Sequence, residues 1–305
     1  MTVKSKKKRI NKIDALFIFS CIALPVINWV IFYIYTNFSS ITMAFTDNAG
    51  AMGLDNFIRF FNEFKLETSD IRVALRNTLI TFAILFVTFP FKVLVSYFIY
   101  KKIPFYRFYR IIFFIPIIIF SVAIATVFVQ MVGVESPIAA LVQKWLDMEN
   151  VPELLADTKF ANTTILLNLI WLSFPGDLII WGGAFARIPE DVLESARLDG
   201  VNWWGEFTKI IVPMVWPTVA LQMVLLFCGI FGATGNVFLL TAGQYETHTI
   251  NSWMYVTLYS NSGSMYTSNV YNYMSAVGLI ITIVAITISL VIRKWTDKAF
   301  EEVEY

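Results

Sequence analysis

The segment RIPEDVLESARLDGVNWWGEFTKIIVP, from Arg187 to Pro213, is polar and carries charges of both signs. It lies between two long apolar runs, in a chain of 305 residues that is 57% hydrophobic and only 15% charged. Soluble globular proteins usually carry about 25% charged residues. The composition therefore indicates an integral membrane protein, and this hydrophilic segment is expected to lie outside the lipid.

Six apolar runs are long enough to cross a bilayer, which takes about 18 or more helical residues. They cover residues 15–36, 77–100, 108–132, 161–185, 211–240 and 270–292. Each is expected to be helical, because lipid offers no partners for unpaired backbone groups. We therefore predict an all-α integral membrane protein with six transmembrane helices after a basic N-terminal segment, residues 1–14.

The distribution of Lys and Arg gives an orientation. If the N-terminus is cytoplasmic, the inner segments hold 16 of the 23 basic residues and the outer segments hold 6, with Lys92 inside a span. The positive-inside rule then predicts that both termini face the cytoplasm. The first apolar run is too long for a signal peptide, and no A-x-A-like cleavage site follows it, so we expect a retained helix. Residues 187–213 are then cytoplasmic.

Several kinds of site are disfavoured by the residue content. Cys21 and Cys228 lie inside apolar runs and imply no disulfide framework. His248 is the single histidine and cannot build a metal site alone. The chain has no G-x-x-x-x-G-K-[ST] loop for nucleotide phosphates, and no His, Cys or carboxylate pair is placed for catalysis. We therefore expect no enzyme activity, no metal site and no nucleic-acid partner.

The opening segment is predicted to form a helical hairpin. Pro189 suits a first helical position, and Gly200 suits the left-handed residue after a helix end. We therefore predict a helix from Pro189 to Asp199 and a second helix that Asn202 caps and that runs to about Ile210. The exposed apolar and aromatic residues allow two interpretations: a hairpin resting on lipid headgroups, or one that inserts into a groove on a cytoplasmic partner.

The same residues resemble the signature loop of bacterial ABC importer permeases, E-A-A, three residues, Gly, nine residues, I-x-L-P. Here the pattern reads Glu194-Ser195-Ala196, then Gly200, then Ile210 to Pro213. Ser195 and Val212 depart from the alanine and leucine of that pattern. The form with Asp199-Gly200 is similar to the carbohydrate branch, although Val201 replaces its usual alanine. The resemblance extends over the neighbouring spans to the C-terminus, whereas the first 70 residues match only in length and topology.

The resemblance implies a type I importer permease of six helices in the bacterial inner membrane. Such a permease holds no ATPase site of its own. It pairs with a second homologous permease and with two ATP-binding subunits that bind ATP and magnesium, and a solute-binding protein delivers the sugar. The coupling segment, residues 187–213, would fit a cleft on the ATPase. Its candidate residues are Glu190, Glu194, Ser195, Ala196, Asp199, Gly200, Trp203, Phe207 and Pro213.

Asp177 is the most conspicuous candidate for the substrate path. It follows Pro175-Gly176 near the middle of a span, where a carboxylate costs about 2.5–3.5 kcal/mol. Ser173, Asp177 and Trp181 recur every four residues, so we expect them to share one helix face. A carboxylate beside an aromatic ring could hold a sugar, or Asp177 could bond a neighbouring helix. In maltose-type permeases, positions matching Ser173 and Gly176 line the sugar path.

Other polar positions give weaker indications. Gln222, Gly229 and Asn236 recur at seven-residue steps in the fifth span, which indicates either a pore face or close helix packing. Asn168 is expected on the opposite side of its helix from Asp177. Lys92 is either a functional group inside its span or a side chain that extends towards the membrane interface. The segments 37–76 and 241–269 suit contact with a solute-binding protein, or form a solvated cap.

We therefore predict a permease subunit of a sugar or oligosaccharide ABC importer, with residues 15–305 as its permease domain. One alternative is an ABC permease for another solute, such as a peptide or polyamine; the uncharged path disfavours an anion. A second alternative is a self-contained secondary transporter or channel. That alternative predicts paired charges within the membrane and an internal repeat, and neither is evident in the sequence.

Overall fold

The computed structural model describes residues 12–47, 49–67, 69–145, 147, 150–232, 236–260 and 267–299. Within these ranges the chain is nearly all helical, and the β-pairing is limited to an isolated bridge between Thr46 and Met52. The predicted all-α class is therefore confirmed. The chain divides into two compact units, residues 1–60 with 265–279 and residues 61–264 with 280–305, and each is described by itself.

The first unit begins with one long helical run. It consists of α1 (Lys12–Trp29), a π-helical stretch η1 (Val30–Tyr35) and α2 (Thr36–Ala44). The apolar part of this run ends at Ala44, beyond the predicted boundary at residue 36. The chain then turns into α3 (Asp55–Lys65), where the Asn56 amide donates hydrogen bonds to the carbonyl oxygens of Ala44 and Thr46 at 3.2 and 2.9 Å.

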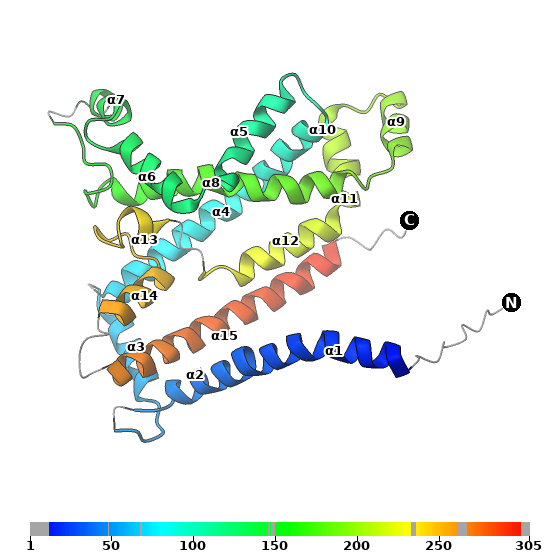
Figure 1. Cartoon of the computed structure of the whole chain (residues 1–305). Coiled ribbons are helices and arrows are strands. Elements are labelled where there is room, and N and C mark those ends of the chain that lie inside the picture. The colour runs from blue at the N-terminus through cyan, green and yellow to red at the C-terminus, as the bar shows by residue number, and fades with distance from the viewer. Residues whose placement is uncertain are drawn as a thin grey trace. The chain divides into compact units, whose positions relative to one another are not determined.

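Two long helices form the frame of the second unit. These are α4 (Asp70–Tyr100) and α8 (Ala161–Phe185), which pack against each other (Figure 1). The remaining helices are α5 (Tyr106–Ile118), α6 (Ser121–Val132), α7 (Pro137–Trp145), α9 (Glu190–Leu198), α10 (Trp203–Glu206), η2 (Phe207–Ile211), α11 (Val212–Met214), α12 (Trp216–Cys228), α13 (Val237–Leu240) and α14 (Ile250–Ser260). The last helix, α15 (Thr267–Ala299), has residues in both units.

Two of the six expected spans contain sharp bends. Four helices within the described residues are long and apolar enough to cross a membrane, and two bent pairs raise the number to six if each pair is one span. The pair α5–α6 bends by 109°, because Ile119 and Phe120 leave helical geometry for extended backbone. The expected spans over 108–132 and 211–240 are therefore not continuous helices.

The fifth span differs most from the expectation. A bend of 75° separates the segment Trp203–Met214 from α12, which ends at Cys228. Gly229 follows α12 outside helical geometry, and Asn236 precedes α13 in the same way. Residues 233–235 lie outside the described ranges. The apolar composition predicted one continuous helix. A turn rich in small residues is as apolar as the helix around it, so hydropathy does not reveal the turn.

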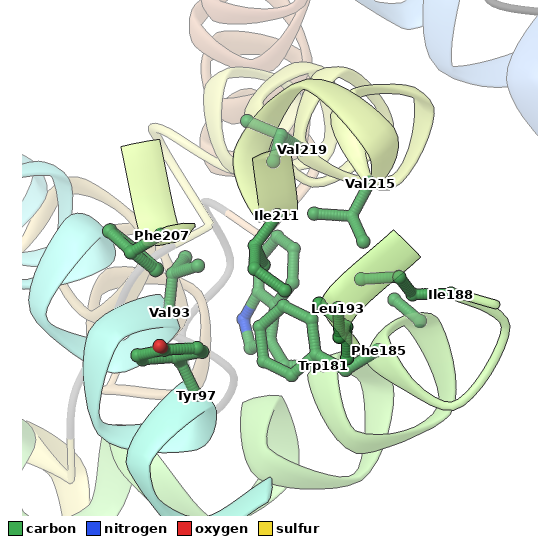
Figure 2. Packing of buried hydrophobic residues seen from close by; sticks show 11 residues of the cluster. Val93, Tyr97, Trp181, Phe185, Ile188, Leu193, Phe207, Ile211, Val215 and Val219 are labelled. Carbon is green, nitrogen blue, oxygen red and sulfur yellow. The ribbon is translucent and has the colours of Figure 1, made fainter. Parts of the chain in front are cut away.

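A buried apolar core joins α4, α8 and the segment that follows α8. In lipid, helices associate mainly through close packing, because the surroundings are themselves apolar. Figure 2 shows the side chains of this core converging from the three parts of the chain. The buried members are Val93, Tyr97, Trp181, Ala184, Phe185, Ile188, Leu193, Phe207, Ile211, Val215 and Val219.

Hydrogen bonds fix the loop between α13 and α14 to the first half of α4. The Asn77 amide donates to the carbonyl oxygens of Glu246 and His248 at 2.6 and 3.0 Å. The Ile250 amide donates to Thr78 Oγ1 at 2.8 Å. Burial lowers the pKa of His248, with partial opposition from Asp70, so its neutral imidazole packs within the loop. The loop is therefore an ordered attachment at this end of the second unit.

Gly243 in this loop permits both a backbone turn and the position of His248. Its φ is +82°, and a Cβ there would lie 1.9 Å from His248 Cε1. Gly50 has a similar φ of +84°, but a Cβ there would have no atom within 4 Å. We expect Gly243→Ala to lower the free energy of unfolding by about 3 kcal/mol, because strain and overlap add. Gly50→Ala should lower it by only about 1 kcal/mol.

Thermal unfolding of the purified variants in one detergent measures this difference. Adding His248→Ala to Gly243→Ala should recover stability to the level of Gly50→Ala, because the overlap is removed and the strained φ remains. Equal effects of the two glycine substitutions would show that the contact between Gly243 and His248 is unimportant.

Candidate functional site

The coupling segment, residues 187–213, contains the predicted helical hairpin. Helix α9 spans Glu190–Leu198, and Gly200 follows with a φ of +70°. The amide of Val201 donates to the Ala196 carbonyl and that of Gly200 to the Arg197 carbonyl, both at 3.1 Å. This pair of bonds is the Schellman arrangement that closes a helix with a left-handed residue. The predicted first helix and the left-handed turn at Gly200 are therefore confirmed.

Asn202 begins the second helix of the hairpin, as predicted. Its side-chain oxygen accepts a hydrogen bond from the Gly205 amide at 2.7 Å, which satisfies one of the free N–H groups of a helix start. The chain then continues through α10, η2 and α11, with Pro213 inside the last of these. The second half of the hairpin therefore continues directly into the core without an intervening loop.

The hairpin has a buried face and an exposed face. Leu193 and Ala196 are buried, whereas Glu194 is exposed and Ser195 bonds back to the Asp191 carbonyl. Large apolar side chains remain exposed in Leu198 at 88% and in Trp203 and Trp204 at 53% each. This outer face has the apolar and aromatic groups that a protein groove can accept.

Phe207, a candidate residue of the coupling segment, does not lie on its exposed surface. The side chain is only 8% exposed and its ring centroid lies 5.2 Å from that of Tyr97 in α4. It belongs to the buried core, because the helix after Asn202 turns this position towards α4 and α8. Phe207 therefore attaches the coupling segment to the membrane helices and is not available to an external partner.

A buried ion pair lies beside Phe207, and sequence reasoning missed it. Lys101 Nζ lies 2.5 Å from Glu206 Oε1, with the Glu206 side chain only 6% exposed. Lys101 is also 5.9 Å from the centroid of the Tyr97 ring. The sequence contained one indication of this pair, because Glu206 is a carboxylate in the apolar half of the hairpin. Lys101 by itself indicated only a basic residue at a membrane boundary. This pair joins the coupling segment to the end of α4.

Lys92 does not extend to the membrane interface, and its ammonium group gives Asp177 a bond to a neighbouring helix, one of the two roles expected for that carboxylate. Lys92 Nζ lies 2.9 Å from Asp177 Oδ2, with side-chain exposures of 8% and 24%. The lysine therefore pairs with a neighbouring helix instead of extending to the interface. This is a pair of opposite charges between two membrane helices, α4 and α8, which the sequence did not reveal.

Trp181 does not form a sugar-binding face with Ser173 and Asp177. The indole is 0% exposed, and its ring centroid lies 5.8 Å from that of Phe89 and 6.3 Å from that of Phe185. Each step of four residues advances about 40° beyond a full helical turn, so eight residues rotate the direction by about 80°. Over that length the face changes from a cavity at Ser173 to the core at Trp181.

A cavity of about 610 Å³ is lined in part by three of the predicted path residues, Ser173, Gly176 and Asn236. Its wall also includes the extended residues between α5 and α6, so the break in the third span forms part of it. Asn236 Nδ2 donates to Asn168 Oδ1 at 3.2 Å. Asn168 is fully buried, and the sequence made it a weaker candidate because it lies across the helix from Asp177. The cavity has no charged lining residue, most of its lining is apolar, and its polar side chains are Ser121, Ser173 and Asn236.

The other two predicted path residues lie elsewhere. Gln222 is half-buried on α12, and Gly229 is exposed after its end; neither lines this cavity. Gln222, Gly229 and Asn236 do not form one stripe, because the helix ends before Gly229.

In the segment 241–269, α14 covers Ile250–Ser260, and residues 261–266 lie outside the described ranges. In the segment 37–76, the structure places α2, α3 and the start of α4.

Comparison with known proteins gives relatives with related names. The chain is 23% identical over 280 residues to the multiple sugar-binding transport system permease protein MsmF of Streptococcus mutans, covering 90% of this chain and 93% of that protein. It is 28% identical over 102 residues to the alpha-glucoside transport system permease protein AglF of Rhizobium meliloti. That match spans 33% of this chain and only 30% of AglF.

Solved structures share the fold. A chain of a bacterial ABC transporter involved in the import of the acidic polysaccharide alginate matches with a TM-score of 0.77 at 22% identity, covering 94% of this chain and 97% of that one. A chain of the alginate transporter in complex with its pentasaccharide-bound periplasmic protein gives 0.78 at 20% identity, covering 98% and 100%.

The family comparison covers most of the chain. Residues 68–302 match the binding-protein-dependent transport system inner membrane component family. The match includes both halves of the coupling segment, the buried ion pairs and the cavity described above. The chain therefore belongs to this family and is a multi-pass inner membrane component of a binding-protein-dependent transport system.

Proposed function

We propose that the chain is a permease subunit of an ATP-driven importer for a sugar or oligosaccharide. Relatives named for multiple sugars, maltodextrin and alpha-glucosides support this substrate class. The cavity at Ser173, Gly176 and Asn236 also supports it, because neutral hydroxyl and amide groups suit the hydroxyls of a sugar. Transport proceeds by alternating access, with both termini of the chain in the cytoplasm.

The main support for the proposal is that the coupling segment has an exposed outer face and a buried continuation. Its outer face presents Glu194 and the exposed indoles of Trp203 and Trp204, while its continuation is packed into α4 and α8 through Phe207. A partner that holds the outer face would therefore exert force directly on two membrane helices. An interfacial hairpin that only rests on lipid would need no such internal attachment.

The partners and cofactors follow from this division of work. Two separate ATP-binding subunits bind ATP and magnesium and hold the coupling segments, so this chain has no ATPase site. A second homologous permease completes the membrane pathway, and an extracytoplasmic solute-binding protein delivers the substrate. The alginate importer solved with its periplasmic protein is an example of such delivery in a protein of the same fold.

A secondary transporter is the second candidate, because the Lys92–Asp177 pair is the kind of intramembrane charge pair that it predicts. A permease for a peptide or polyamine is the remaining alternative. Uptake of labelled sugars into proteoliposomes holding the whole importer tests all three. Uptake that requires ATP and a sugar-loaded binding protein supports the proposal, whereas uptake without ATP supports the secondary transporter.

The turn of the coupling segment gives the first functional prediction. Proline cannot adopt the φ of +70° at Gly200, so Gly200→Pro should misplace α9 against the ATPase. Glu194→Lys should reverse a charge on the docking face. In proteoliposomes we expect each variant to reduce ATP-coupled uptake by at least about tenfold, equivalent to about 1.4 kcal/mol. Lys294→Glu reverses an exposed charge on α15, outside the coupling segment and outside the segments expected to contact the binding protein, and should leave uptake unchanged. Normal coupled uptake in both segment variants would reject the docking role.

The Lys101–Glu206 pair gives a prediction on stability and on coupling. In a double-mutant cycle with Lys101→Met and Glu206→Gln, we expect an interaction energy of about 2 kcal/mol, because the carboxylate is buried. The matched control is the exposed pair of Arg76 and Glu246, 3.9 Å apart, which should give less than about 1 kcal/mol. Glu206→Gln should also lower the substrate transported per ATP hydrolysed. Equal values for the two pairs would contradict a special role for Glu206.

Neutral variants of Lys92 and Asp177 distinguish two roles of Asp177, a connection between two helices and a ligand for the substrate. Removing one partner should cost about 3–5 kcal/mol of stability, because the other charge stays buried. The double variant Lys92→Met with Asp177→Asn should recover most of this stability, as measured by thermal unfolding. If the pair connects α4 and α8, sugar uptake recovers with stability. A stable double variant that has lost uptake would instead identify Asp177 as a substrate ligand.

A further inference from the structure

A second cavity of the unit, of about 530 Å³, lies between α4, α5 and α8. It is separate from the cavity that contains Ser173, since the two share no lining residue. Its volume is within the range of about 300–1,000 Å³ that binding pockets for small molecules occupy. Nothing in the proposed transport mechanism uses this cavity.

The lining of the cavity includes two basic side chains and two phenols. Lys102 lies in the turn after α4 and Arg110 lies on α5, and Tyr100 and Tyr106 also line the cavity. Among the described residues, no carboxylate is within ion-pair distance of Lys102 or Arg110, and the Arg110 guanidinium lies 5.7 Å from the centroid of the Phe114 ring. Two unneutralised cations that share one cavity favour an anionic occupant.

Much of the remaining lining is apolar. Ile99, Phe114, Leu178 and Ile179 form this apolar wall, together with Gly182 and Gly183 of α8. A Cβ at either glycine would meet no atom within 4 Å, so the space beside α8 is unfilled. An occupant that matches the whole lining needs both a charged group and hydrocarbon.

We propose that this cavity binds an anionic phospholipid, with its phosphate against Lys102 and Arg110 and an acyl chain along the apolar wall. The cations lie at the boundary of two apolar helices, where a lipid headgroup lies in a bilayer. Basic pockets between transmembrane helices on the cytoplasmic side bind anionic headgroups in other membrane proteins. A free phosphate would use the cations alone and would leave the apolar wall without a contact.

Lipid binding to the full chain tests the proposal. Delipidated protein is titrated with phosphatidylglycerol or phosphatidylcholine, and retained lipid is measured by native mass spectrometry. We expect phosphatidylglycerol to bind more tightly. Lys102→Gln and Arg110→Gln should each weaken it about fivefold, because each basic residue near a headgroup contributes a similar amount. Arg187→Gln removes an exposed cation after α8 that does not line the cavity, and should change binding less than twofold.

A variant that fills the cavity tests whether the lipid binds inside it or is only attracted by surface charge. Gly183→Leu keeps every charge and occupies the open space, so it should also weaken phosphatidylglycerol binding about fivefold or more. Gly183→Ala serves the same purpose with a smaller change if the leucine variant does not fold. Unchanged binding in a folded glycine variant, or equal losses in Arg187→Gln and Arg110→Gln, would overturn the proposal.

Soluble competitors distinguish the source of the phosphate. Inorganic phosphate, glycerol phosphate and a soluble uronic-acid oligosaccharide are added at concentrations matching the lipid. None should displace phosphatidylglycerol, because none contacts the apolar wall. Displacement by either phosphate compound would identify a soluble phosphate site, and displacement by the oligosaccharide would assign the cavity to the substrate path.

Discussion

The attachment of the coupling segment to α4 and α8 is the constraint on which the rest of the structure depends. Phe207 and Ile211 are buried in the same core as Tyr97 and Trp181, and Glu206 pairs with Lys101 beside them. A close-packed core transmits displacement because it has little free volume to absorb it. Movement of the segment therefore requires movement of both long helices.

The two buried ion pairs place α4 at the centre of these connections. Lys101 joins its end to the coupling segment, and Lys92, about two and a half turns earlier, joins it to α8. A buried pair contributes little net stability over a packed apolar pair, but breaking one partner is costly. Such pairs therefore fix which helices stay together, and α4 and α8 are expected to move as one body.

The broken helices border a cavity that combines a few polar groups with a mainly apolar lining. Extended residues after α5 and the non-helical Asn236 both border the cavity at Ser173 and Gly176. Irregular backbone at membrane depth is tolerated where it lines a cavity or is buried in protein. Helix α8 takes part in both features, because its last turns enter the buried core while Ser173 and Gly176 line the cavity.

The sequence by itself determined the helical class, the approximate positions of the spans and the geometry of the hairpin, because apolar runs, Gly200 and Asn202 act through local rules. The tertiary structure alone decided which charges are paired and which rings are buried. Lys92 and Asp177 are 85 residues apart in the chain, and no local pattern relates them. Trp181 was expected beside the substrate path and Phe207 in the coupling segment, and long-range packing placed both in the core.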